Sequence, residues 1–264
     1  MKHLSFSTKS LVAGLTLAVG LAFATGAQAE TKQGKAEVKA IRGTAKYSTG
    51  GNVWVPLKVG TVLRSGAIIQ TAMESTVDLF LGQNGPVVRM TPETTLSFDK
   101  LVYTDTGADT VVDTQLNLQS GRILGNVKKL AAASHYEIKL PTGVAGIRGT
   151  DYDVTARKLG NGKYEIRVTS ITGTLIGSAV VGVDPVTAVI NTGETWTPEG
   201  GVEKLTPEIL AHLQTEIQVA INRAEQFPPQ SGPRGTPIVT PFDPQTGPSG
   251  RPPPGPVPTH TGHP

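Results

Sequence analysis

The residues best suited to chemistry in this sequence are two carboxylates, Asp151 and Asp153, which follow Arg148. Two positions apart in an expected strand, both carboxylates project from the same face. A catalytic carboxylate pair has this spacing, and so does a salt bridge with Arg148 at a corner of the chain. We favour the salt bridge, because no nucleophile elbow, phosphate loop or nucleotide fingerprint accompanies the pair. The sequence therefore predicts no enzyme activity.

The histidines and other aspartates do not show the spacing of a metal site. Four histidines follow the N-terminal segment: His135, His212, His260 and His263. No two of them have the spacing of a zinc-binding helix. Asp105, Asp109 and Asp113 fit neither a helix-loop-helix calcium loop nor a glycine-rich calcium repeat. We expect no metal and no cofactor.

The aromatic side chains offer a different kind of site. Four of them could stack on sugar rings if they were exposed together: Tyr47, Trp54, Tyr103 and Trp196. Isolated aromatics in strands more often pack in the core, because their rings bury a large apolar area. The sequence leaves both interpretations open.

The N-terminal segment has the organisation of an export signal. Lys2 and Lys9 precede an apolar run from Leu11 to Ala24, and Ala27-Gln28-Ala29 is a small-residue cleavage site. The run is shorter than the roughly 20 residues of a membrane span. We predict a signal peptide over residues 1–29 and no membrane span after cleavage, with an uncleaved signal anchor as the alternative. The protein is then periplasmic or secreted.

Charge and cysteine content narrow the class of protein further. The sequence has no cysteine, which excludes disulfides and an acylated N-terminal cysteine. Its net charge of +3 falls to +1 once Lys2 and Lys9 leave with the signal peptide. Because no cationic face is visible, we expect no binding to nucleic acid.

Residues 36–200 have the pattern of short strands separated by glycine turns. Val77, Leu79 and Leu81 point to one face of an expected strand and Asp78 and Phe80 to the other, and Gly160-Asn161-Gly162 is typical of a hairpin. Strands of this length predict an all-β fold, a single β-rich domain that is roll-like, sandwich-like or solenoid-like. Ile41-Arg42-Gly43-Thr44 recurs as Ile147-Arg148-Gly149-Thr150, which suggests two equivalent corners.

The C-terminal part begins with an amphipathic helix over residues 206–226. Thr206 can cap it, Pro207 suits its first position, and Glu208 complements its dipole. The apolar stripe comprises Ile209, Leu210, Leu213, Ile217, Ile221 and Ala224. The helix either caps an open end of the β domain or docks a partner. Residues 227–264 are rich in proline and glycine and predict a disordered tail, either a spacer or a segment that reaches the cell wall or presents a ligand.

The most specific motif is the segment from Leu140 to Val154. Gly143, Gly146 and Gly149 recur every three residues, which suits corners that need positive φ or close approach. This segment resembles the signature of FecR-type domains. The signature residues, expected to form a structural corner, are Pro141, Thr142, Gly143, Gly146, Arg148, Gly149 and Thr150. Three further pieces follow the family pattern: 57–71, 77–85 and 118–127. Departures are Gln83–Pro86 in place of an Asp-Gly-Ser turn and Leu140 in place of threonine.

The resemblance implies a β-rich periplasmic module that contacts other proteins. Membrane regulators of the family begin with a cytoplasmic sigma-binding arm, whereas an export signal comes first here, so we do not carry over that role. We expect a non-catalytic exported module that binds another cell-envelope protein through its β surface or a sheet edge. The alternatives are a module that binds glycan or peptidoglycan, and an enzyme that acts on envelope polymers through Asp151 and Asp153.

Overall fold

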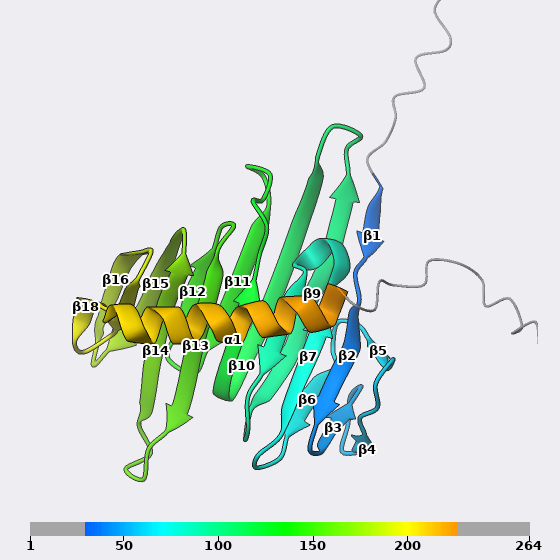
Figure 1. Cartoon of the computed structure of the whole chain (residues 1–264), viewed down its shortest axis with the longest axis horizontal. Coiled ribbons are helices and arrows are strands. Elements are labelled where there is room, and N and C mark those ends of the chain that lie inside the picture. The colour runs from blue at the N-terminus through cyan, green and yellow to red at the C-terminus, as the bar shows by residue number, and fades with distance from the viewer. Residues whose placement is uncertain (1–29, 226–264) are drawn as a thin grey trace, which may run out of the picture. The chain divides into compact units, whose positions relative to one another are not determined.

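The computed structural model describes residues 30–225, which fold into a strand-rich unit with one helix near the C-terminus (Figure 1). This arrangement confirms the predicted all-β class and the predicted helix. The expected signal peptide (1–29) and proline-rich tail (227–264) lie outside the described residues. Residues 30–225 belong to one compact unit.

The strands form two sheets. Sheet A runs in the order β4 (Val55–Pro56), β3 (Ala45–Ser48), β6 (Ile68–Thr71), β9 (Thr95–Asp105), the first part of β10 (Thr110–Asn126), β11 (His135–Leu140), β12 (Gly143–Ile147), β15 (Thr174–Val181) and β16 (Asp184–Asn191). Strand β1 (Thr31–Gln33) pairs with the end of β9. The pairings are antiparallel except that of β10 with β11.

Sheet B is antiparallel throughout and lies beneath the helix. Its order is β5 (Val62–Leu63), β2 (Ala36–Arg42), β7 (Thr76–Phe80), β8 (Val87–Met90), the last part of β10, β13 (Asp151–Lys158), β14 (Tyr164–Thr172), β17 (Glu194–Thr197) and β18 (Gly201–Lys204). A short 3-10 helix, η1 (Gly82–Asn84), connects β7 to β8.

Strand β10 belongs to both sheets and bends between them at Gly121. Before this residue β10 pairs with β9 in sheet A, and from it onward β10 pairs with β13 in sheet B. Gly121 has a φ of 98°, and a Cβ there would lie 2.5 Å from the Cα of Thr94. Only glycine tolerates both conditions, so this residue allows one strand to connect the two layers.

The main core lies between the sheets. Phe98 and Leu116 from sheet A and Leu79 from sheet B belong to one cluster of buried apolar side chains. Tyr136 of sheet A meets Tyr152 of sheet B, with hydroxyl oxygens 3.2 Å apart. Burial raises the pKa of both tyrosines, so they remain neutral and the buried pair keeps its hydrogen bond.

Helix α1 (Pro207–Glu225) begins as the sequence predicts and lies across the outer face of sheet B (Figure 1). The hydroxyl of Thr206 accepts the backbone N–H of Ile209 at 3.4 Å, the contact of an N-cap residue. The helix buries four side chains against sheet B: Leu213, Ile217, Ala220 and Ala224. It therefore covers a face of sheet B, which differs from the open end that one of the two expected roles would have it cap. Ile209 is half-exposed and does not belong to the buried stripe.

Candidate functional site

The FecR-like signature occupies a hairpin and the corner that follows it. Pro141 and Thr142 form the turn between β11 and β12, and Gly143 and Gly146 lie within β12. Residues 148–150 then connect β12 to β13 and carry the chain from sheet A to sheet B.

Gly149 lies at a corner of the chain, and so does Gly43, the matching glycine of the repeated tetrapeptide. The φ of Gly149 is 79°, and a Cβ would lie 2.8 Å from the Cα of Lys129. Gly43, the equivalent residue of the earlier tetrapeptide, has a φ of 77° and turns the chain from sheet B to sheet A. Ile171-Thr172-Gly173-Thr174 makes a third such corner, from β14 to β15. Sequence reasoning missed it, although the Ile-x-Gly-Thr pattern is visible.

Gly143 and Gly146 differ from Gly149 and from each other. Neither has positive φ. A Cβ on Gly143 would lie 2.2 Å from the carbonyl oxygen of Ser178, so this position needs close approach. A Cβ on Gly146 would meet nothing nearer than 3.8 Å, an ordinary contact with Ile176. The fold therefore does not require glycine at position 146. The absence of a side chain there leaves a hollow on the outer face of sheet A.

A groove of about 440 Å³ includes Gly146. Its apolar lining includes Val144 and Ile176, and its polar lining includes Glu137 and Arg148. Arg148 is exposed and lies in a part of the signature that points away from the core. The groove thus combines an apolar surface with one anionic and one cationic group, a composition suited to a polypeptide partner.

An aliphatic face adjoins this groove on sheet A. We use this name for Ile176, Val180 and Val189 of strands β15 and β16, together with Val183 of the loop between these strands; their exposed fractions are 51%, 55%, 57% and 92%. Ile176 and Val189 are direct neighbours on β15 and β16. Sequence reasoning did not identify this face, because β15 has apolar residues on both of its sides and the exposed ones resemble core residues. The signal that could have revealed the face is that apolar residues occur at successive positions of the strand.

The two candidate catalytic carboxylates are structural. Asp153 pairs with Arg122 of β10, with Oδ2 2.8 Å from Nη2, and Arg122 also binds Glu216 of α1 at 2.9 Å. Asp151 accepts a hydrogen bond from Asn126. The sequence suggested Arg148 as the cation of a salt bridge here, and this is wrong: the cation beside Asp153 is Arg122.

The ionisation of this pair is set by burial and by the neighbouring charges. Burial raises the pKa of Asp153, and the hydrogen bonds and charge of Arg122 offset part of that effect. Burial alone would lower the pKa of Arg122, but Asp153 and Glu216 outweigh it, and the pKa rises. The arginine therefore stays charged and connects sheet B to the helix.

A second ion pair lies beneath the same helix. Arg89 of β8 donates to Asp78 of β7 at 2.6 Å and 2.9 Å. The same guanidinium donates to the backbone carbonyl of Glu216 at 3.0 Å, and Arg223 of α1 approaches Asp78 at 3.5 Å. Both ion pairs thus fix the register of α1 on sheet B.

The four aromatic side chains that could stack on sugar rings do not form a shared exposed surface. Trp196 is 2% exposed and lies between the sheets, where a Cβ on Gly177 would come within 2.5 Å of its ring. Tyr47 and Tyr103 are half-buried. Trp54 alone among the four is exposed, so of the two interpretations that the sequence left open, the shared stacking surface is not the one that the structure forms.

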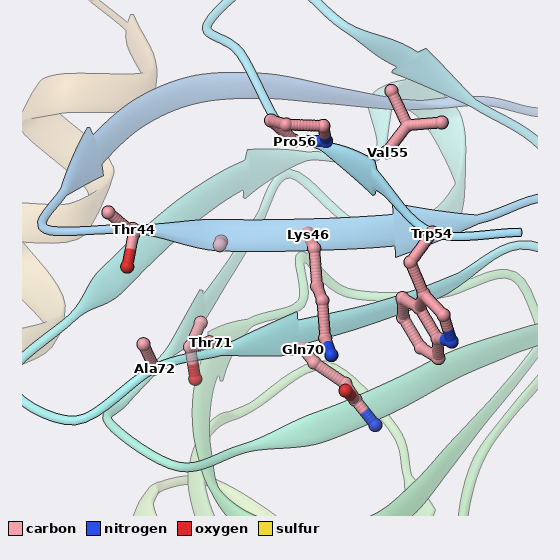
Figure 2. Close-up of a pocket in the computed structure, with 9 residues that line it drawn as sticks. Thr44, Lys46, Trp54, Val55, Pro56, Gln70, Thr71 and Ala72 are labelled. Carbon is pink, nitrogen blue, oxygen red and sulfur yellow. The ribbon is translucent and has the colours of Figure 1, made fainter.

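Trp54 nonetheless lines a pocket of about 660 Å³ (Figure 2). Lys46 from β3 and Gln70 from β6 extend beside the indole, and the Lys46 ammonium lies 4.9 Å from the ring centroid. Thr44 and Thr71 lie toward the other end of the pocket. The lining can therefore stack on a flat apolar surface and donate hydrogen bonds.

The remaining histidine and aspartates that the sequence analysis considered as metal ligands lie at the surface or in ion pairs. His135 lies 3.2 Å from Glu137, and Asp113 pairs with Lys100. Asp105 and Asp109 flank the tip between β9 and β10. Among residues 30–225, no group of three or more histidine or acidic side chains could hold a metal. No helix in this range is both long and apolar enough to cross a membrane.

Comparison with known proteins agrees with the signature. The family model described as FecR protein matches residues 67–175. Two solved structures of a candidate anti-sigma factor from Parabacteroides distasonis ATCC 8503 are similar, at 14% and 12% identity with TM-scores of 0.40 and 0.42. Each alignment covers 56% of this chain and 64% of the other, and no curated protein matches. Residues 67–175 thus correspond to the FecR protein model, and the signature from Pro141 to Thr150 lies within this range.

Proposed function

We propose that this protein is a non-catalytic, exported FecR-like module that binds another cell-envelope protein on the outer face of sheet A. The observation that carries the proposal is the aliphatic face beside the Gly146 groove. Exposed apolar patches next to charged groups mark protein-binding surfaces. Arg148 and Glu137 supply opposite charges that can orient the partner.

The proposal places the module outside the cytoplasm. The support is the export signal expected in residues 1–29 together with the FecR domain, since proteins with this domain are associated with the envelope. The protein then acts by contact with a partner.

In-cell crosslinking of the tagged full chain, followed by mass spectrometry of the envelope fraction, tests this function. We expect one saturable protein partner, whose recovery falls at least about tenfold in Ile176→Glu, because the new carboxylate loses its hydration when the partner binds. Val59→Glu, at a residue that is 62% exposed and distant in sequence, is the matched control. Recovery of wall fragments alone, or equal recovery from both variants, would overturn the proposal.

The Trp54 pocket supports a second candidate function, the binding of glycan or peptidoglycan. An exposed indole beside amide, hydroxyl and ammonium groups matches what a sugar ring requires. We expect cosedimentation with cell-wall sacculi that is lost in Trp54→Ala and kept in Met73→Ala, whose side chain is also exposed. Equal sedimentation of both variants would exclude this pocket. Trp196 does not contribute to this pocket, because it is buried.

A further inference from the structure

Strand β16 ends sheet A without a neighbour on its outer side. Among the described strands, β16 pairs in register with β15 alone. The strand spans eight residues, and Asp184 at its start is the one charged side chain. An uncharged edge of this length is a template for another strand.

The other sheet edges of the described chain are short, and two of them, β1 with Lys32 and β18, carry charge as well. Strand β18, at the same end of the molecule, has four residues and includes Glu203 and Lys204. Strands β4 and β5 have two residues each, and β4 contains Pro56. Short length, charge and proline all oppose strand pairing. Strand β16 has one charge and one proline, Asp184 and Pro185, but both lie at its start, and the strand has neither from Val186 to Asn191.

Hairpin geometry identifies the backbone groups that β16 leaves unpaired. Gly182 and Val183 form a two-residue loop between the opposed residues Val181 and Asp184, and Gly182 has a φ of 66°. In such a hairpin the closing pair exchanges hydrogen bonds, and the direction of the backbone groups then alternates. The N–H and C=O groups of Thr187 and Val189 therefore point toward the open edge.

We propose that β16 pairs antiparallel with β16 of a second copy of this chain, about a two-fold axis at Ala188. This register sets Thr187 of each copy opposite Val189 of the other, so both residues exchange their free N–H and C=O groups. The β-branched side chains of the two residues then become cross-strand neighbours. Asp184 falls opposite Thr192 of the other copy, which keeps the like charges apart.

The self-complementary register is the reason to choose a second copy as occupant. The strand is uncharged between Pro185 and Asn191, so antiparallel self-pairing creates no like-charge contact. Pairing would extend sheet A across both copies. It would also bring the exposed Val189 side chains of the two copies onto one surface. The aliphatic face would thereby double in width, which goes beyond the binding of an envelope partner.

Sedimentation equilibrium of the full chain over a range of concentrations tests the pairing. We expect a reversible dimer in the wild type. The dissociation constant of the dimer should rise at least about tenfold in Thr187→Lys, because two ammonium groups then approach each other across the axis. Thr174→Lys changes an exposed residue of β15 away from the edge and should leave the dimer intact. Thermal melting should show that both variants fold.

Disulfide trapping tests the register independently. The sequence has no cysteine, so Ala188→Cys introduces a single thiol. Directly opposed residues of a non-hydrogen-bonded pair lie about 4.5 Å apart at Cα, which is within reach of a disulfide. We expect a covalent dimer on mild oxidation and none from Ser178→Cys. A monomer at all concentrations, or a dimer that ignores Thr187→Lys without the Ala188→Cys crosslink, would overturn this pairing. Neither result depends on the envelope-partner pull-down.

Discussion

The outer faces of the two sheets carry apolar side chains but use them differently. On sheet B, Val87, Leu124 and Ile171 face outward and are buried by helix α1. On sheet A, Ile176 and Val189 also face outward and remain about half-exposed. Within residues 30–225, no helix covers sheet A as α1 covers sheet B (Figure 1).

The difference shows how the same strand pattern serves stability or binding. Sheet B adds buried ion pairs that tie α1 down through Arg89 and Arg122, so this face is completed within the chain. Sheet A presents its apolar side chains beside a groove and a free edge. The contrast predicts that changes on sheet B unfold the protein, whereas changes on sheet A alter association.

The largest effect should come from removing the helix from sheet B. Ile217→Asp places a carboxylate in the buried interface and should lower the free energy of unfolding by about 3–5 kcal/mol. Ile209→Asp, on the exposed side of the same helix, should change it by less than about 0.5 kcal/mol. Urea unfolding measures both. Equal effects would mean that α1 contributes little to the stability of sheet B.

The corner between the sheets should be nearly as sensitive. Gly149→Val combines positive φ with a backbone clash and should cost at least about 2 kcal/mol. Gly146→Val adds a side chain to the open groove and should cost less than about 1 kcal/mol. Thermal melting separates the two variants, and an unchanged melting temperature in Gly149→Val would refute the corner assignment.

The ion pair under the helix should rank third. Arg122→Met leaves Asp153 buried without its cation, which should cost about 2–3 kcal/mol because the arginine is partly exposed. Arg148→Met changes the arginine that the sequence suggested as the partner of Asp153. This substitution should change the free energy of unfolding by less than about 0.5 kcal/mol. Chemical denaturation of both variants distinguishes the two pairings.

The protonation of Asp153 should produce a smaller and pH-dependent effect. Because its folded pKa lies above the ordinary 3.8, the contribution of this group to stability is largest below that pH and declines as the pH rises through the folded pKa. Wild type should therefore gain stability relative to Asp153→Asn on acidification, by about 1.4 kcal/mol per unit of pKa difference. Parallel urea titrations between pH 7 and pH 3 measure it. A relative loss on acidification would show that pairing with Arg122 dominates burial.

The smallest effect on stability should come from the aliphatic face itself. Val180→Lys changes a residue that is 55% exposed, so the free energy of unfolding should stay within about 0.5 kcal/mol of wild type. Capture of the envelope partner should nevertheless fall. A variant that unfolds would place Val180 with the core, and would remove the contrast between the two faces.

Local patterns of the sequence determined the strand-rich class, the FecR signature and the start of the helix. Alternation along one strand and the run Thr206-Pro207-Glu208 act through neighbouring residues, so they can be interpreted without the fold. The Ile-x-Gly-Thr repeat likewise marked corners, because a positive φ is a property of a single residue.

The tertiary structure decided which side chains meet. It paired Asp153 with Arg122, which lies 31 positions away, and left the nearby Arg148 exposed. It buried Trp196 while leaving Trp54 at the surface, and it covered the outer face of sheet B but not that of sheet A. These outcomes depend on the register between strands distant in the chain, and alternation within one strand is the same whichever face another element covers.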